Sequence, residues 1–250
     1  MFKRLKERRK KVLLTSGCSF SETISPQIDT WPRHLARRMS DYQHHSHAMG
    51  SQGNGLISRS IIHACTQHKD ADIIVGIVWS GSDRHDFYIK DIEYNHLKKS
   101  ELRTNNDGWM ENPTGFTALK RWIILNHSWS NAYAKAYYGM FHDRIGCKIY
   151  TLEHILRTQW FLKQHRIPYF MSTYTSEVLR GVKDNSDCKH LYDLIDFDKW
   201  LPVDGIYEWV KDNIGEDGFP IKDNLHPSSF AHKEFTDKVI VPFIEDLKKG

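Results

Sequence analysis

Residues 73–79 read IIVGIVW, a continuous apolar run that is rich in β-branched side chains. A strand of this composition is typical of a parallel sheet that helices cover on both faces. Nearer the N-terminus, helical stripes over residues 31–42 and 57–65 alternate with an apolar run at residues 12–14 and a short strand expected over residues 46–49. This alternation predicts an α/β fold, a three-layer α/β/α sandwich around a central parallel sheet.

The second half of the chain continues this pattern after one break. Periodicity fades over residues 84–117, where we expect a surface insertion. Residues 128–165 carry large side chains at helical spacing and predict one long helix or two successive helices, followed by a strand over residues 167–173. A last helix is expected from about Ser229, kinked or shortened by Pro242.

Length and charge indicate one large domain behind a basic arm. The chain has 250 residues, 40% of them hydrophobic, which is enough for a substantial core. We predict a single domain over residues 12–250 and an N-terminal arm over residues 1–11. The arm carries seven basic side chains and one acid, so its charge is +6 and that of the remaining chain is −2. Residues 12–250 show no cluster of basic side chains of the kind that binds nucleic acid. We therefore expect the arm to be a solvated tail and expect no nucleic-acid partner.

The sequence also bears on membrane association and cellular location. No run approaches the roughly eighteen apolar residues of a membrane helix, and no apolar stretch typical of a signal peptide precedes the first strand. We therefore expect a cytoplasmic protein with no membrane contact. No pattern in the chain indicates an oligomeric state.

Cysteines and histidines are numerous but do not form a recognisable metal motif. The four cysteines lack Cys-x-x-Cys spacing, which argues against a disulfide framework or a structural zinc site, and Cys18 is expected to be a small packed side chain. His44, His45 and His47 lie close together, but no neighbouring acid or cysteine completes a site with them. The glycines match no phosphate-binding loop. We predict no metal and no organic cofactor.

Two short motifs at opposite ends of the chain carry the residue types of acyl transfer. Ser19 follows an apolar strand and Gly17, so we expect it just past the carboxyl end of a strand, where open α/β sheets place their active sites. His226 stands before the last helix and three positions after Asp223, close enough for that carboxylate to hold Nδ1 while Nε2 faces outward. A serine nucleophile, a histidine base and an orienting acid are used together in acyl-enzyme catalysis.

The motif GCS at residues 17–19 and the motif DNLH at residues 223–226 resemble the first and last blocks of the SGNH (GDSL-like) hydrolase family, Gly-Asp-Ser and Asp-x-x-His. Cys18 stands where the family has aspartate, which is not a triad position. The resemblance implies an SGNH-hydrolase or flavodoxin-like fold in which Ser19 is the nucleophile, His226 the base and Asp223 its partner. The chain also resembles divergent SGNH-like proteins encoded by bacteriophages, which implies a virion-associated location as an alternative to the cytoplasm.

The two middle blocks of that family hold the oxyanion with a glycine amide and an asparagine side chain. In the stretch GSQGNG at residues 50–55, the resemblance implies Gly53 as the amide donor, with Asn54 capping the next helix and Gly50 as a substitute. After the strand at residues 73–79, Ser82 stands where the family has asparagine, so we expect the Ser19 and Gly53 amides to hold the oxyanion with the Ser82 hydroxyl as a weaker third donor. Loss of one such donor typically costs about 10²- to 10³-fold in turnover.

The sequence therefore leaves three functions open. The first is a serine-dependent ester hydrolase that needs no cofactor and acts on a small-molecule or carbohydrate ester, for example an acetylated sugar. The second is an acyltransferase that uses the same triad with an alcohol in place of water. The third is a non-catalytic binding or virion structural protein on the same fold, which the serine at position 82 favours.

Overall fold

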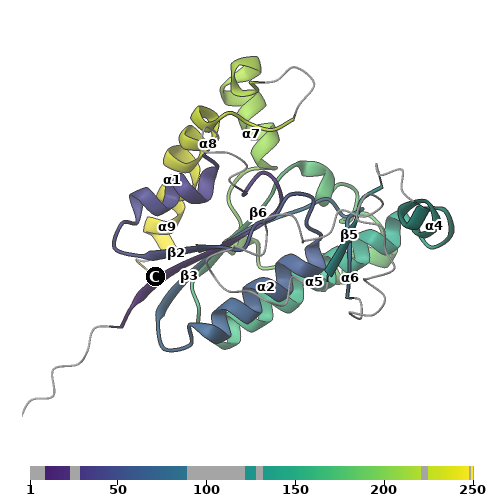
Figure 1. Ribbon diagram of the computed structural model, residues 1–250, viewed down its shortest axis with the longest axis horizontal. Coiled ribbons are helices and arrows are strands. Elements are labelled where there is room, and N and C mark those ends of the chain that lie inside the picture. The colour runs from purple at the N-terminus through teal and green to yellow at the C-terminus, as the bar shows by residue number, and fades with distance from the viewer. Residues whose placement is uncertain are drawn as a thin grey trace, which may run out of the picture.

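A computed structural model describes residues 9–22, 29–88, 122–127, 132–220, 225–247 and 249 of the chain. Within these ranges, the central sheet has four parallel strands in the order β2-β1-β3-β6 (Figure 1). The apolar run that predicts a buried strand is β3, which pairs with β1 on one side and β6 on the other. The strands are β1 (Lys11–Ser16), β2 (Gln43–Ser46), β3 (Asp72–Trp79) and β6 (Tyr169–Thr173).

Helices cover both faces of this sheet and complete the predicted three-layer α/β/α sandwich (Figure 1). Side chains alternate along β1, so Val12 and Leu14 join the core on one face and Leu13 joins the core on the other. The first face is covered by α2 (Asn54–Gln67), α5 (Arg144–Gln164) and α6 (Ser186–Tyr192). The second face is covered by α1 (Trp31–Arg38), α7 (Ile206–Asn213), α8 (Ser229–Phe235) and α9 (Val241–Leu247).

Several expected boundaries shift in the structure. β2 covers Gln43–Ser46 instead of residues 46–49, because an edge strand needs backbone pairing with β1 but little side-chain burial. Residues 128–165 contain two helices, α4 (Ala132–Met140) and α5, and the Asp143 side chain caps the second by accepting from the Gly146 N–H at 2.6 Å. Short 3₁₀ helices cover Ser176–Val178, Phe197–Lys199 and Gly215–Gly218.

The C-terminal helix changes type where the proline was expected to disturb it. α8 passes into a π-helical stretch, Thr236–Ile240, and the chain continues as α9. Pro242 lies in the first turn of α9, where a missing N–H is best tolerated.

The start of the expected insertion is a strand. β4 (His85–Tyr88) pairs antiparallel with β5 (Trp122–Leu125), so the segment predicted as irregular from residue 84 begins with regular structure. The rest of that prediction, residues 89–117, lies outside the described residues, as do residues 1–8 of the basic arm. The strand character of β4 was not predicted because its partner is far away along the chain.

The N-terminus of α2 is held by a residue of β4. The Asp86 carboxylate accepts hydrogen bonds from the Gly53 and Leu56 N–H groups, both at 3.0 Å, and so satisfies two of the free donors of the helix. Asn54 was expected to cap this helix, and that expectation is wrong. Its side chain instead donates to the Ser80 carbonyl at 3.0 Å and accepts from the Ser80 N–H at 2.8 Å, because this carboxylate already occupies the helix end.

The described part of the chain contains no helix long and apolar enough to cross a membrane. All four cysteines are buried and free of disulfides, and Cys18 is a fully buried packed side chain, as expected.

Gly76 of β3 has no side chain, and this leaves room for two aromatic rings in the core between the sheet and α1. A methyl group on Gly76 would lie 2.5 Å from Cζ of Phe170 and 3.1 Å from Cη2 of Trp31. The rings of Trp31 and Phe170 are fully buried and meet edge to face, with their centroids 5.7 Å apart. Neither ring can move without disturbing the face covered by α1.

We predict that Gly76→Ala lowers the free energy of unfolding by roughly 1–3 kcal/mol, because the added methyl overpacks these rings. Urea unfolding measures the change. Gly139→Ala in α4 is the matched control, since a methyl there meets nothing within 4 Å, and it should be neutral or slightly stabilising. An unchanged free energy of unfolding in Gly76→Ala would show that the core can accommodate a methyl group at this position.

Candidate active site

Ser19 lies in a tight turn at the carboxyl end of β1. The N–H groups of Ser21 and Glu22 both donate to the Cys18 carbonyl, at 2.8 and 3.1 Å, which closes the turn around Ser19. Gly17 lets β1 enter this turn, because a methyl group there would lie 2.8 Å from the Val78 carbonyl oxygen of β3. The serine is therefore held on a rigid part of the sheet.

The structure brings His226 to this serine from the other end of the chain. His226 Nε2 lies 2.6 Å from Ser19 Oγ, across 207 positions of sequence. The loop that carries the histidine is fixed directly after it, since the Ser228 N–H donates to the Gly218 carbonyl at 2.7 Å and the Ser228 hydroxyl accepts from Ala231 N–H at 3.1 Å. Nε2 is therefore the ring nitrogen that faces the serine hydroxyl. Asp223, the expected third member, lies outside the described residues.

The surroundings of His226 favour its neutral form. Burial lowers the pKa of His226, and the positive charge of Arg84 lowers it further. The Phe20 ring packs beside the imidazole, with centroids 5.0 Å apart. A neutral imidazole with Nε2 against a hydroxyl is the arrangement in which histidine can accept a serine proton.

Arg84 is a site residue whose place the sequence did not reveal. Its Nη1 donates to Ser80 Oγ at 2.8 Å, and its guanidinium lies 5.4 Å from the centre of the Tyr174 ring. It also lies close enough to Cys18, the residue before Ser19, to interact with it electrostatically. In the sequence, Arg84 is a single arginine two positions after Ser82, and no motif marks it as a site residue. Its orientation depends on the turn between β3 and β4.

The charge of Arg84 is retained at this position. Partial burial alone would lower the pKa of Arg84, but Cys18, Tyr174 and Asp83 outweigh it, so the pKa is raised. None of the ion pairs found among the described residues involves Arg84.

The two glycine amides expected as oxyanion donors are both engaged. The Gly53 N–H donates to Asp86, as described above, and the Gly50 N–H donates to the Glu22 carboxylate. Neither is a free donor, and the reason is that carboxylates from distant segments reach them. The amide of Ser19 makes no backbone hydrogen bond to another described residue.

Ser82 is half-buried and lies beside a different cavity from the one nearest His226. Among the described residues, no hydrogen bond links Ser82 to Ser19 or His226. It lines a cavity of about 440 Å³ together with Asp83, His142 and Cys147. Its hydroxyl is therefore not held by a described partner in an oxyanion-binding orientation.

A second cavity, of about 400 Å³, is lined by residues that flank Ser19 and His226 in the sequence. Its walls include Phe20 and Leu225, the sequence neighbours of the pair, and combine aromatic with polar side chains. A larger cavity, of about 610 Å³, lies at the amino edge of the sheet near Asp72 and Pro168, at the opposite ends of the strands from Ser19. Proximity to the serine, and not size, therefore identifies the cavity of interest.

No family model matches the sequence, and no curated protein matches it. Among solved structures, a crystal structure of TesA matches with a TM-score of 0.52 and 12% sequence identity, over 95% of this chain and 99% of that chain. TesA has the SGNH α/β hydrolase fold. At this level of identity the match establishes a shared fold over nearly the whole of both chains, and it confirms the predicted α/β fold class.

Proposed function

We propose that this protein is a serine-dependent ester hydrolase that works through an acyl-enzyme. The distance of 2.6 Å between His226 Nε2 and Ser19 Oγ carries the proposal, because it lies within the range for proton transfer between base and nucleophile. The fold shared with TesA over nearly the whole chain supports a hydrolase. Ser19 attacks the acyl carbon while His226 takes its proton and then passes it to the departing alcohol. Water, activated by the same histidine, releases the acid.

Asp223 completes the proposed triad. It stands three positions before His226, and a carboxylate at that spacing can accept the Nδ1 proton and stabilise the imidazolium that forms during attack. This role rests on the sequence motif alone.

We assign the main stabilisation of the oxyanion to the Ser19 amide and to the charge of Arg84. The guanidinium lies close enough to lower the pKa of His226 and carries no ion-pair partner among the described residues. A cation in a partly desolvated site stabilises developing negative charge strongly. Ser82 remains a weaker third donor in this proposal. Gly53 would contribute only if its amide left the Asp86 carboxylate.

The substrate we propose is a carbohydrate ester, such as an acetylated sugar. The cavity beside the pair is lined by the rings of Phe20, Tyr174 and Tyr207, against which a sugar face can stack. Lys211 and Asp212 line the same cavity and offer hydrogen-bonding groups for sugar hydroxyls. Glu208 lines it too, but its Oε1 atom already accepts from the Thr175 and Ser176 hydroxyls, at 2.7 and 2.8 Å.

We predict that a fluorophosphonate probe labels the native protein, because the probe reacts with a serine whose proton is taken by a base. Labelling should fall to background in Ser19→Ala and in His226→Gln, as measured by mass spectrometry of the intact chain. Ser186→Ala, at an exposed serine of α6, is the matched control and should label normally. Well-folded wild-type protein that takes up no probe would favour the non-catalytic binding role.

We predict that Arg84→Gln lowers kcat by about 10²- to 10³-fold, the usual cost of losing one oxyanion donor. The pH profile should move as well. The cation lowers the pKa of His226, so removing it raises that pKa, and the acid limb of kcat/KM should shift to higher pH.

Arg84→Lys is the control for charge, because it keeps the cation and should leave the acid limb near its wild-type position. An unshifted acid limb in Arg84→Gln would show that the guanidinium does not act on His226. A shifted limb with unchanged kcat would assign Arg84 to positioning of the base and not to the oxyanion.

A further inference from the structure

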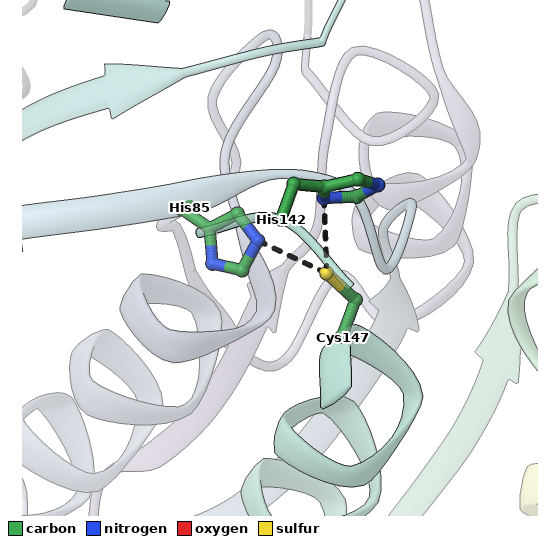
Figure 2. A group of neighbouring side chains, drawn as sticks. All are labelled: His85, His142 and Cys147. Atoms are coloured by element: carbon green, nitrogen blue, oxygen red, sulfur yellow. Dashed lines mark hydrogen bonds between the residues drawn. The ribbon is translucent and has the colours of Figure 1, made fainter. Parts of the chain in front are cut away.

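Three potential metal ligands converge at the junction of β4, the α4–α5 turn and α5. Cys147 Sγ lies 3.4 Å from His85 Nε2 and 3.4 Å from His142 Nδ1, and Figure 2 shows both imidazoles directed at the sulfur. The three ligand atoms all lie within 4.8 Å of one another. The sequence does not predict this cluster, because His85 is 62 positions from Cys147.

The two sulfur–nitrogen distances are those that a tetrahedral zinc ion imposes on its ligands. Zinc binds cysteine sulfur at about 2.3 Å and histidine nitrogen at about 2.0–2.1 Å, which places sulfur and nitrogen about 3.5 Å apart in a tetrahedral site. Both sulfur–nitrogen distances here are 3.4 Å. We propose that His85, His142 and Cys147 bind one Zn²⁺ ion.

A hydrogen-bonded cluster is the competing explanation. A thiol has one hydrogen, so it can donate to only one imidazole, and the other ring must then donate its own N–H to the sulfur. Such bonds are weak, whereas a metal engages both rings and the sulfur together.

The surroundings leave one coordination position accessible. His142 and Cys147 line the cavity of about 440 Å³, and the cationic side chains of Arg144, Lys148 and Arg180 line it too. Three protein ligands and an open fourth position are typical of zinc sites that keep a water or a small anion. His85 lies on the inner side, packed against the Tyr137 ring at 4.8 Å between centroids.

The ion would join β4 to α5. His85 is adjacent to Asp86, which caps α2, so a metal at His85 would also stiffen the strand that holds that helix end. This inference does not rest on the serine chemistry, and Ser19→Ala should bind zinc like the wild type.

The test begins with the full-length wild type stripped by a chelator and dialysed. We expect uptake of one Zn²⁺ per chain in isothermal titration calorimetry, a rise in Tm with added zinc, and no response to Mg²⁺, which prefers oxygen ligands. With Co²⁺ as the probe, a thiolate-to-cobalt charge-transfer band should appear. Folded wild-type protein that takes up no stoichiometric zinc would overturn the proposal.

Variants then identify the ligands. Cys147→Ser should abolish the charge-transfer band, and His85→Gln and His142→Gln should each weaken zinc binding by at least about 100-fold, more than loss of a supporting contact costs. Cys188→Ser, at another buried cysteine, and His190→Gln, at an exposed histidine, are the matched controls and should bind normally. Binding that survives in folded Cys147→Ser, or is lost equally in the controls, would place the metal elsewhere and contradict the assignment.

Discussion

Pairing of β1 with β3 at the centre of the sheet is the constraint on which the candidate site depends. The two strands run parallel in a register that matches Lys11 with Asp72 and Ser16 with Ile77, so they end at the same edge. Both are buried, and their backbone groups have no access to water that could replace the ladder. The turn that carries Ser19 and the turn that leads to Arg84 therefore emerge side by side. Gly17, which approaches the Val78 carbonyl, allows them to do so without a clash.

The electrostatics of the site depend on Arg84, a half-buried cation. Burying this cation costs desolvation free energy, which the contacts with Ser80 and the Tyr174 ring and the charge of Asp83 offset. The positive charge of Arg84 acts on His226 and lowers its pKa. In the proposed reaction the same charge attracts the oxyanion.

β4 connects the two functional proposals through the alternation of side chains along a strand. Asp86 points to α2 and binds two of its N–H groups, whereas the preceding residue, His85, points to the first turns of α5 and contacts Cys147. One short strand thus holds a helix end beside the serine site and contributes a ligand to the cysteine cluster. Tyr138 adds to this junction by donating to the Leu125 carbonyl of β5 at 3.0 Å.

Local patterns in the sequence were sufficient for the fold class and for the two ends of the proposed triad. The β-branched run of β3 and the helical stripes predict the three-layer sandwich because period and composition are properties of neighbouring residues. The same holds for Ser19 after the first strand and for His226 before the last helix, whose Ser228 cap is local.

Only the tertiary structure decided which donors are free and which side chains meet. Gly53 is engaged by Asp86, Arg84 lies against Cys18, and Cys147 meets two histidines, one of them 62 positions away. Each of these contacts joins segments that are distant in sequence, and hydrogen-bond partners across such distances depend on how the layers pack. Sequence periodicity carries no information on that packing beyond which faces are apolar. The sequence by itself therefore determined the architecture and singled out Ser19 and His226 as the proposed pair, and the packed structure determined the electrostatics around them.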